Sequence, residues 1–137
     1  MTARDAQVPP IQTILLVEDE VLIRLHIARY LRDCGFNVIE AIDAEEALQV
    51  LQSEHGVDLV VSDVELSGPM DGFGLAQWVR SNKKGVKVVL AGTPERAAST
   101  AAELCEEGPT LAKPYDPQIL ADLIRRHLAI GRKEDES

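Results

Sequence analysis

Carboxylates gather directly after two apolar segments of the chain. Glu18, Asp19 and Glu20 follow the run ILLV, and Asp63 closes the run LVVSD. Like charges at one spot repel each other and are costly to remove from water, so something has to compensate for them. A bound divalent cation, a lysine such as Lys113, or solvent at the start of a helix would each do so.

The combination of Asp19, Asp63 and Lys113 indicates phosphoryl chemistry at a hard cation. Mg²⁺ takes carboxylate and backbone oxygens, keeps several waters and bridges to phosphate. A carboxylate beside Mg²⁺ and a lysine can attack a phosphoryl group, because both cations neutralise charge on the group in transfer. Such a reaction needs one carboxylate as the nucleophile and one or two more as metal ligands.

Short β-branched runs alternate with stretches of helical periodicity along the chain. Apolar strands without internal alternation are buried on both faces, and strand–helix alternation gives a parallel sheet with right-handed crossovers. The pattern predicts an α/β fold with a doubly wound sheet, in which ligands bind beyond the carboxyl ends of the strands. The expected strands cover 12–17, 37–42, 58–63, 86–91 and 110–113, and the expected helices cover 20–34, 44–54, 72–82, 94–106 and 117–129.

The composition limits the domain count and the classes of partner. At 137 residues, with 45% hydrophobic and 27% charged residues, the chain is expected to form one globular domain over 11–129. Residues 1–10 are expected to form a flexible arm, and 130–137 a charged tail that frays. The net charge of −9 argues against a nucleic-acid or anionic-membrane surface.

The cellular compartment is predicted from what the sequence lacks. No apolar run reaches the roughly 18–20 residues of a membrane-spanning helix, and no signal-peptide pattern opens the chain. Cys34 and Cys105 are far apart and form no disulfide framework, so the reducing cytoplasm is the expected location.

Three segments, LLVEDE, VVSDVELSGPMDG and AKPYDP, resemble the motifs of the response-regulator receiver domains of two-component signalling. The resemblance extends roughly from Gln12 to Leu128, and the motifs fall at the ends of the first, third and fifth expected strands. It implies a flavodoxin-like (βα)5 fold, with a five-stranded parallel sheet in the order 2-1-3-4-5.

The resemblance also implies a role for each site residue. Asp63 would be the phosphoacceptor and a metal ligand, and would take its phosphoryl group from a sensor histidine kinase or a histidine phosphotransfer protein. Asp19 would bind Mg²⁺ or Mn²⁺ directly, with Glu18 as its helper. The backbone carbonyl of Glu65 would complete the protein ligands, and Lys113 would contact the carboxylates and then the phosphoryl oxygens.

Three features depart from the pattern of receivers. The loop between Asp63 and the glycine of the MDG sequence is one residue longer than the commonest spacing. Receivers carry Ser or Thr at the end of the fourth strand, where an ungapped comparison places Gly92 here, with Thr93 one position later. Either Thr93 supplies the switch hydroxyl or the site lacks it.

The third departure is that the aromatic residue that usually lies three positions before the lysine is replaced by Thr110. We therefore expect that phosphorylation still occurs but that the output face responds in another way.

The sequence therefore predicts a stand-alone receiver that signals through contacts with a downstream protein. The sequence does not reveal the identity of that partner. No enzymatic activity is expected beyond self-phosphorylation and slow self-dephosphorylation, and neither nucleic acid nor membrane is an expected partner. A homodimer is compatible with the sequence. Two alternatives remain: a pseudo-receiver that is never phosphorylated, and a Mg²⁺-dependent aspartyl phosphohydrolase. The second is disfavoured because Glu65 occupies the place of that enzyme class's second Asp.

Overall fold

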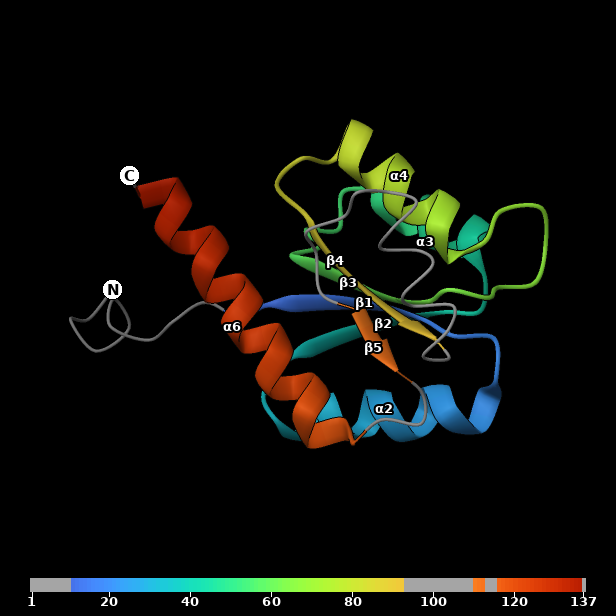
Figure 1. The fold of residues 1–137 in the computed structure, drawn as a ribbon, viewed down its shortest axis with the longest axis horizontal. Helices are drawn as coiled ribbons and strands as arrows, with labels where there is room; N and C mark the ends of the chain where they lie inside the picture. The colour runs from blue at the N-terminus through green and yellow to red at the C-terminus, as the bar shows by residue number, and fades with distance from the viewer. Residues whose placement is uncertain (1–10, 93–109, 113–115, 137) are drawn as a thin grey trace.

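The computed structural model describes residues 11–92, 110–112 and 116–136, which form an α/β fold around one sheet (Figure 1). The five strands are parallel and lie in the order β2-β1-β3-β4-β5, which confirms the predicted fold and strand order. The helix expected over 94–106 lies outside the described residues. The elements are β1 (Thr13–Val17), α2 (Val21–Asp33), β2 (Asn37–Ala41), α3 (Ala44–Gln52), β3 (Leu59–Asp63), α4 (Gly72–Asn82), β4 (Lys87–Gly92), β5 (Thr110–Ala112) and α6 (Pro117–Glu136).

Local sequence signals explain where several helices begin and end. Asp43 caps α3 by accepting a hydrogen bond from the Glu46 N–H at 2.9 Å, and Asp71 caps α4 by accepting one from the Gly74 N–H at 2.8 Å. After α2 the chain turns at Gly35, whose φ of 98° lies in the left-handed region that favours glycine.

Helices cover both faces of the sheet, with α2 and α6 on one side and α3 and α4 on the other (Figure 1). The side chains of β1 alternate between the two layers. Ile14 and Leu16 pack with α2 and α6, whereas Leu15 and Val17 pack with α3 and α4. All four are at most 1% exposed, so β1 is fixed from both faces and holds the residues that follow it in place.

Helix α6 is longer than the sequence predicts. We expected it to end near residue 129 and the tail 130–137 to fray, but the helix continues to Glu136. The added segment contains no proline, and its arginine, lysine and glutamate residues are good helix formers that follow the weak helix former Gly131, so a change to polar composition does not end the helix. Within the described ranges, no helix combines the length and the apolar character needed to cross a membrane.

Candidate functional site: an acidic cluster at the carboxyl edge of the sheet

Three carboxylates converge at the carboxyl ends of β1 and β3. Glu18, Asp19 and Asp63 each offer one oxygen, and these oxygens all lie within 4.8 Å of one another. The parallel register places Val17 beside Ser62, so the residues that follow on each strand meet at one edge. The convergence of these three side chains is what the strand ends predict. We call Glu18, Asp19 and Asp63 the acidic cluster.

Exposure differs across the acidic cluster. Asp19 is exposed, Asp63 is half-buried, and Glu18 is only 3% exposed. A carboxylate as buried as that of Glu18 is costly to desolvate, and a cation bound by its neighbours would offset part of that cost. The cluster is therefore open to solvent at Asp19 and closed at Glu18.

The loop after β3 holds Asp63 through its backbone. The Glu65 N–H donates to Asp63 Oδ1 at 3.1 Å and so orients the carboxylate. Val64, which lies between Asp63 and Glu65, donates its N–H to the Ala91 carbonyl at 2.8 Å, and its own carbonyl accepts from the Gly72 N–H at 3.0 Å. This loop is therefore anchored to both β4 and the start of α4.

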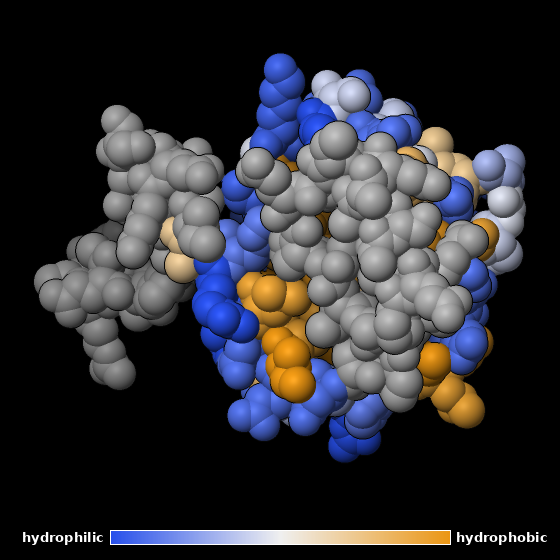
Figure 2. Space-filling view, in the orientation of Figure 1, coloured by the Kyte–Doolittle hydropathy of each residue, from blue (hydrophilic) through white to orange (hydrophobic). Residues whose placement is uncertain are grey.

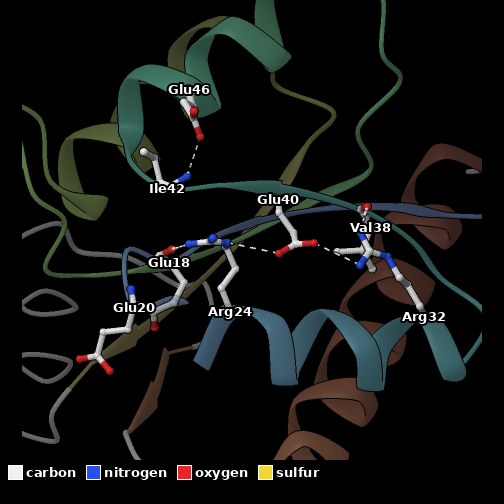
Figure 3. A network of polar contacts seen from close by, with 8 residues as sticks. All are labelled: Glu18, Glu20, Arg24, Arg32, Val38, Glu40, Ile42 and Glu46. Atoms are coloured by element: carbon white, nitrogen blue, oxygen red, sulfur yellow. Dashed lines mark hydrogen bonds and ion pairs between the residues drawn. The ribbon is translucent and has the colours of Figure 1, made fainter. Parts of the chain in front are cut away.

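Hydrogen bonds from three neighbouring segments hold Glu18, and one of them involves Arg24, which the sequence does not predict as a site residue. The Glu18 N–H donates to the Ala41 carbonyl at 3.1 Å, and its Oε2 accepts from the Glu20 N–H at 3.2 Å. Its carbonyl accepts from Nη1 of Arg24 at 2.9 Å. Figure 3 shows how this arginine extends from α2 between Glu18 and Glu40 of β2. Glu40 is the charged residue of β2, and its charge between Ile39 and Ala41 was the signal that a partner had to lie nearby.

The remaining predicted site residues are placed only in part. Gly92 is the buried last residue of β4, and Glu65 is exposed in the loop after Asp63. Thr93 and Lys113 lie outside the described residues, although Lys113 directly follows the end of β5. The structure therefore brings together the three carboxylates and leaves the predicted lysine and switch hydroxyl as expectations.

The acidic cluster fits a hard divalent cation better than a soft one. Its donors are all carboxylate oxygens, the ligands that Mg²⁺ and Mn²⁺ prefer, whereas structural zinc sites favour Cys and His. Ligand oxygens on opposite sides of Mg²⁺ lie about 4.2 Å apart, twice the usual bond length of ~2.1 Å. The spacing of up to 4.8 Å is only slightly wider, and carboxylates that bind through water reach further.

Comparison with known proteins identifies the family. The family model of the response regulator receiver domain matches residues 14–125. The chain belongs to this family. Receiver domains are signalling modules rather than enzymes in the usual sense, and in this receiver the matched region contains the whole acidic cluster.

Individual relatives agree with this assignment. The receiver is 34% identical over 133 residues to the transcriptional regulatory protein PdtaR of Mycobacterium tuberculosis, which covers 96% of this chain and 62% of PdtaR. It is 34% identical over 106 residues to the probable chemotaxis protein CheY of Rhizobium etli, covering 74% of this chain and 81% of that protein. The chain thus spans less than two thirds of PdtaR and most of CheY.

A solved structure matches over nearly the full length of both chains. It is the signal receiver domain of an HD domain-containing protein from Pseudomonas fluorescens, with a TM-score of 0.83, 29% identity, and coverage of 95% of this chain and 96% of that chain. The fold of this chain is therefore that of a known receiver domain.

Proposed function

We propose that this receiver accepts a phosphoryl group on Asp63 from a sensor histidine kinase or a histidine phosphotransfer protein in the cytoplasm, and signals through contacts with a downstream protein. The observation that carries the proposal is the convergence of Glu18, Asp19 and Asp63 within 4.8 Å at one edge of the sheet, in a chain that matches the receiver family over 14–125. A nucleophilic carboxylate needs neighbours that hold a cation, and these residues are adjacent to it.

In the proposed reaction, a carboxylate oxygen of Asp63 attacks the phosphorus atom of the donor. A phosphorus–oxygen bond forms, and the bond from phosphorus to the donor's imidazole nitrogen breaks with its electron pair leaving to the donor. The Glu65 N–H at 3.1 Å from Asp63 Oδ1 orients the carboxylate for this attack. Lys113, which follows β5, is proposed to contact the phosphoryl oxygens.

Mg²⁺ or Mn²⁺ is proposed to be held by the carboxylates of Glu18, Asp19 and Asp63 and by the backbone carbonyl of Glu65. When bound, the cation supplies charge neutralisation for the phosphoryl oxygens. Asp19 is the exposed member of the acidic cluster and is suited to direct binding, whereas Glu18 is buried and contributes from beneath.

A protein donor is supported by apolar surface beside the acidic cluster. Val21, Leu22 and Leu25 at the start of α2 are 54%, 82% and 50% exposed, and Figure 2 shows apolar atoms at the end of the molecule where α2 begins, at lower right. Exposed apolar side chains at one place favour contact with another protein. We propose that the donor packs against this surface while its phosphohistidine reaches Asp63.

The direct test is to incubate the full chain with acetyl phosphate and Mg²⁺ and to measure its intact mass. Wild type is expected to gain one phosphoryl group, Asp63→Ala none, and Glu45→Ala, an exposed acidic residue of α3 outside the cluster, as much as wild type. A wild type that gains no mass while a known receiver is labelled in parallel would favour the pseudo-receiver alternative. Sustained turnover of small phosphate esters would instead favour a phosphohydrolase.

A further inference from the structure

We propose that Arg24 is a positioning residue for the acidic cluster: with Glu40 it clamps the backbone of Glu18, and thereby sets the affinity of the cluster for a divalent cation. The inference rests on the proposed function, because it takes the acidic cluster to be the cation site. Arg24 contacts the backbone carbonyl of Glu18, and it has no role in the proposed reaction.

The first observation is the path of the Arg24 side chain. Arg24 lies in the first turn of α2, and its side chain extends back to the end of β1, where Nη1 donates to the Glu18 carbonyl at 2.9 Å. Its Nε donates to Oε1 of Glu40 at 3.2 Å. Only 13% of the Arg24 side chain and 23% of the Glu40 side chain are exposed. Partial burial strengthens such charge-assisted bonds and keeps the guanidinium in one place.

The second observation is that β2 fixes both backbone polar groups of Glu18, one directly and the other through Arg24. The Ala41 carbonyl accepts from the Glu18 N–H at 3.1 Å, while Glu40, the preceding residue, holds the arginine that donates to the Glu18 carbonyl. Both backbone polar groups of Glu18 are therefore tied to one short piece of β2, as Figure 3 shows for the arginine side. The direction of the Glu18 side chain follows from this fixed backbone.

The third observation is the charge of the clamp. Arg24 and Glu40 form an ion pair, so the clamp fixes the backbone with a guanidinium whose charge is matched by a carboxylate. Lysine could not replace arginine here, since a single ammonium group cannot bond in the planar fork that reaches both the carbonyl and the carboxylate. Residues that orient metal ligands from behind typically change metal affinity by about 10–100-fold when they are lost.

The chain offers a matched control on the same helix. Arg32 donates from Nη1 to the other oxygen of Glu40 at 3.1 Å, but its Nη2 reaches the Val38 carbonyl at 2.8 Å rather than Glu18. Arg24→Lys and Arg32→Lys therefore each weaken one arginine–Glu40 pair between α2 and β2. Only the first removes a contact to the acidic cluster.

The experiment is isothermal titration of the full chain with Mg²⁺, and with Mn²⁺ as a second probe, alongside thermal unfolding without metal. Arg24→Lys is expected to weaken binding by about tenfold and Arg32→Lys by less than about twofold, at similar melting temperatures. Equal affinities for Arg24→Lys and wild type, or equal losses in both variants, would overturn the positioning role. A wild type that binds neither metal would instead overturn the proposed cation site itself.

Glu40→Gln provides a second route if Arg24→Lys does not fold. It removes the charge that holds Arg24 but leaves the arginine in place, and the same loss of Mg²⁺ affinity is expected. Unchanged affinity in a folded Glu40→Gln variant would contradict the clamp.

Discussion

Gly72, the first residue of α4, lies directly against the backbone of Asp63. A methyl group at position 72 would overlap the Asp63 carbonyl oxygen, and would come within 2.8 Å of the carbonyl carbon and 3.0 Å of Ser62 Oγ. The Gly72 N–H also donates to the Val64 carbonyl at 3.0 Å. The glycine of the MDG sequence is thus required by the close approach of α4 to the proposed phosphoacceptor.

We expect Gly72→Ala to displace the backbone of Asp63. Overpacking of this kind typically destabilises by about 1–3 kcal/mol, measurable by urea unfolding, and the labelling of Asp63 by acetyl phosphate should slow several-fold. Gly85→Ala is the control, because a methyl group there meets nothing within 4 Å. Equal stability and labelling in both variants would show that α4 can shift without consequence for Asp63.

Asp19→Asn is expected to weaken Mg²⁺ binding, because it removes the charge of the exposed cluster member. A ligand at 100 times its dissociation constant stabilises the folded state by about 2.7 kcal/mol, so Mg²⁺ should raise the melting temperature of wild type and raise that of Asp19→Asn less. Glu20→Gln changes an adjacent exposed carboxylate outside the cluster and should respond as wild type does. If Glu20→Gln reduces the Mg²⁺-induced rise in melting temperature as much as Asp19→Asn does, that rise comes from the general negative charge of the region and not from a specific cation site.

Leu22→Glu is expected to separate protein donors from small-molecule donors. Leu22 is 82% exposed at the start of α2, so a charge there should leave the fold and the labelling by acetyl phosphate unchanged. Phosphotransfer from a histidine phosphotransfer protein that labels wild type should slow, because the apolar contact is lost. Unaltered transfer from that donor would place its binding surface elsewhere on the receiver.

The switch hydroxyl, if the chain has one at the end of β4, has to come from Thr93. Gly92 is the last residue of β4 and carries no side chain. We expect Thr93→Val, which keeps the shape and removes the hydroxyl, to reduce the amide chemical-shift changes that beryllofluoride causes over residues 92–116. Identical changes in wild type and Thr93→Val would mean that this receiver responds without a hydroxyl at that strand end.

The order of strands and the convergence of the acidic cluster could be predicted from sequence, because both follow from local signals. Apolar runs without alternation locate buried parallel strands, and the carboxyl ends of such strands meet at one edge. The strand boundaries fall within one residue of those expected at β1, β2, β3, β4 and β5. Glu18, Asp19 and Asp63 were then placed together by topology alone.

The contacts that hold the acidic cluster could not be predicted in the same way. The clamp formed by Arg24 and Glu40, and the contact between Gly72 and Asp63, depend on side-chain direction and on the distance between elements. Neither follows from the periodicity of a single segment. The predicted end of α6 near residue 129 is wrong for a different reason, because a change from apolar to charged residues does not by itself end a helix, and α6 continues past Gly131 to Glu136.

The register between β1 and β3 makes the acidic cluster a product of the finished sheet. Val17 and Ser62 are neighbours in that pairing, and they belong to segments that are far apart in the chain. A slip of one residue would turn the following side chains to opposite faces, and pairing between distant segments is slow compared with local structure. In a partly folded chain that lacks this pairing, Glu18 and Asp19 are therefore separated from Asp63. On the proposed function, only receivers with the correct β1–β3 pairing can accept the phosphoryl group, so misfolded chains do not carry the signal.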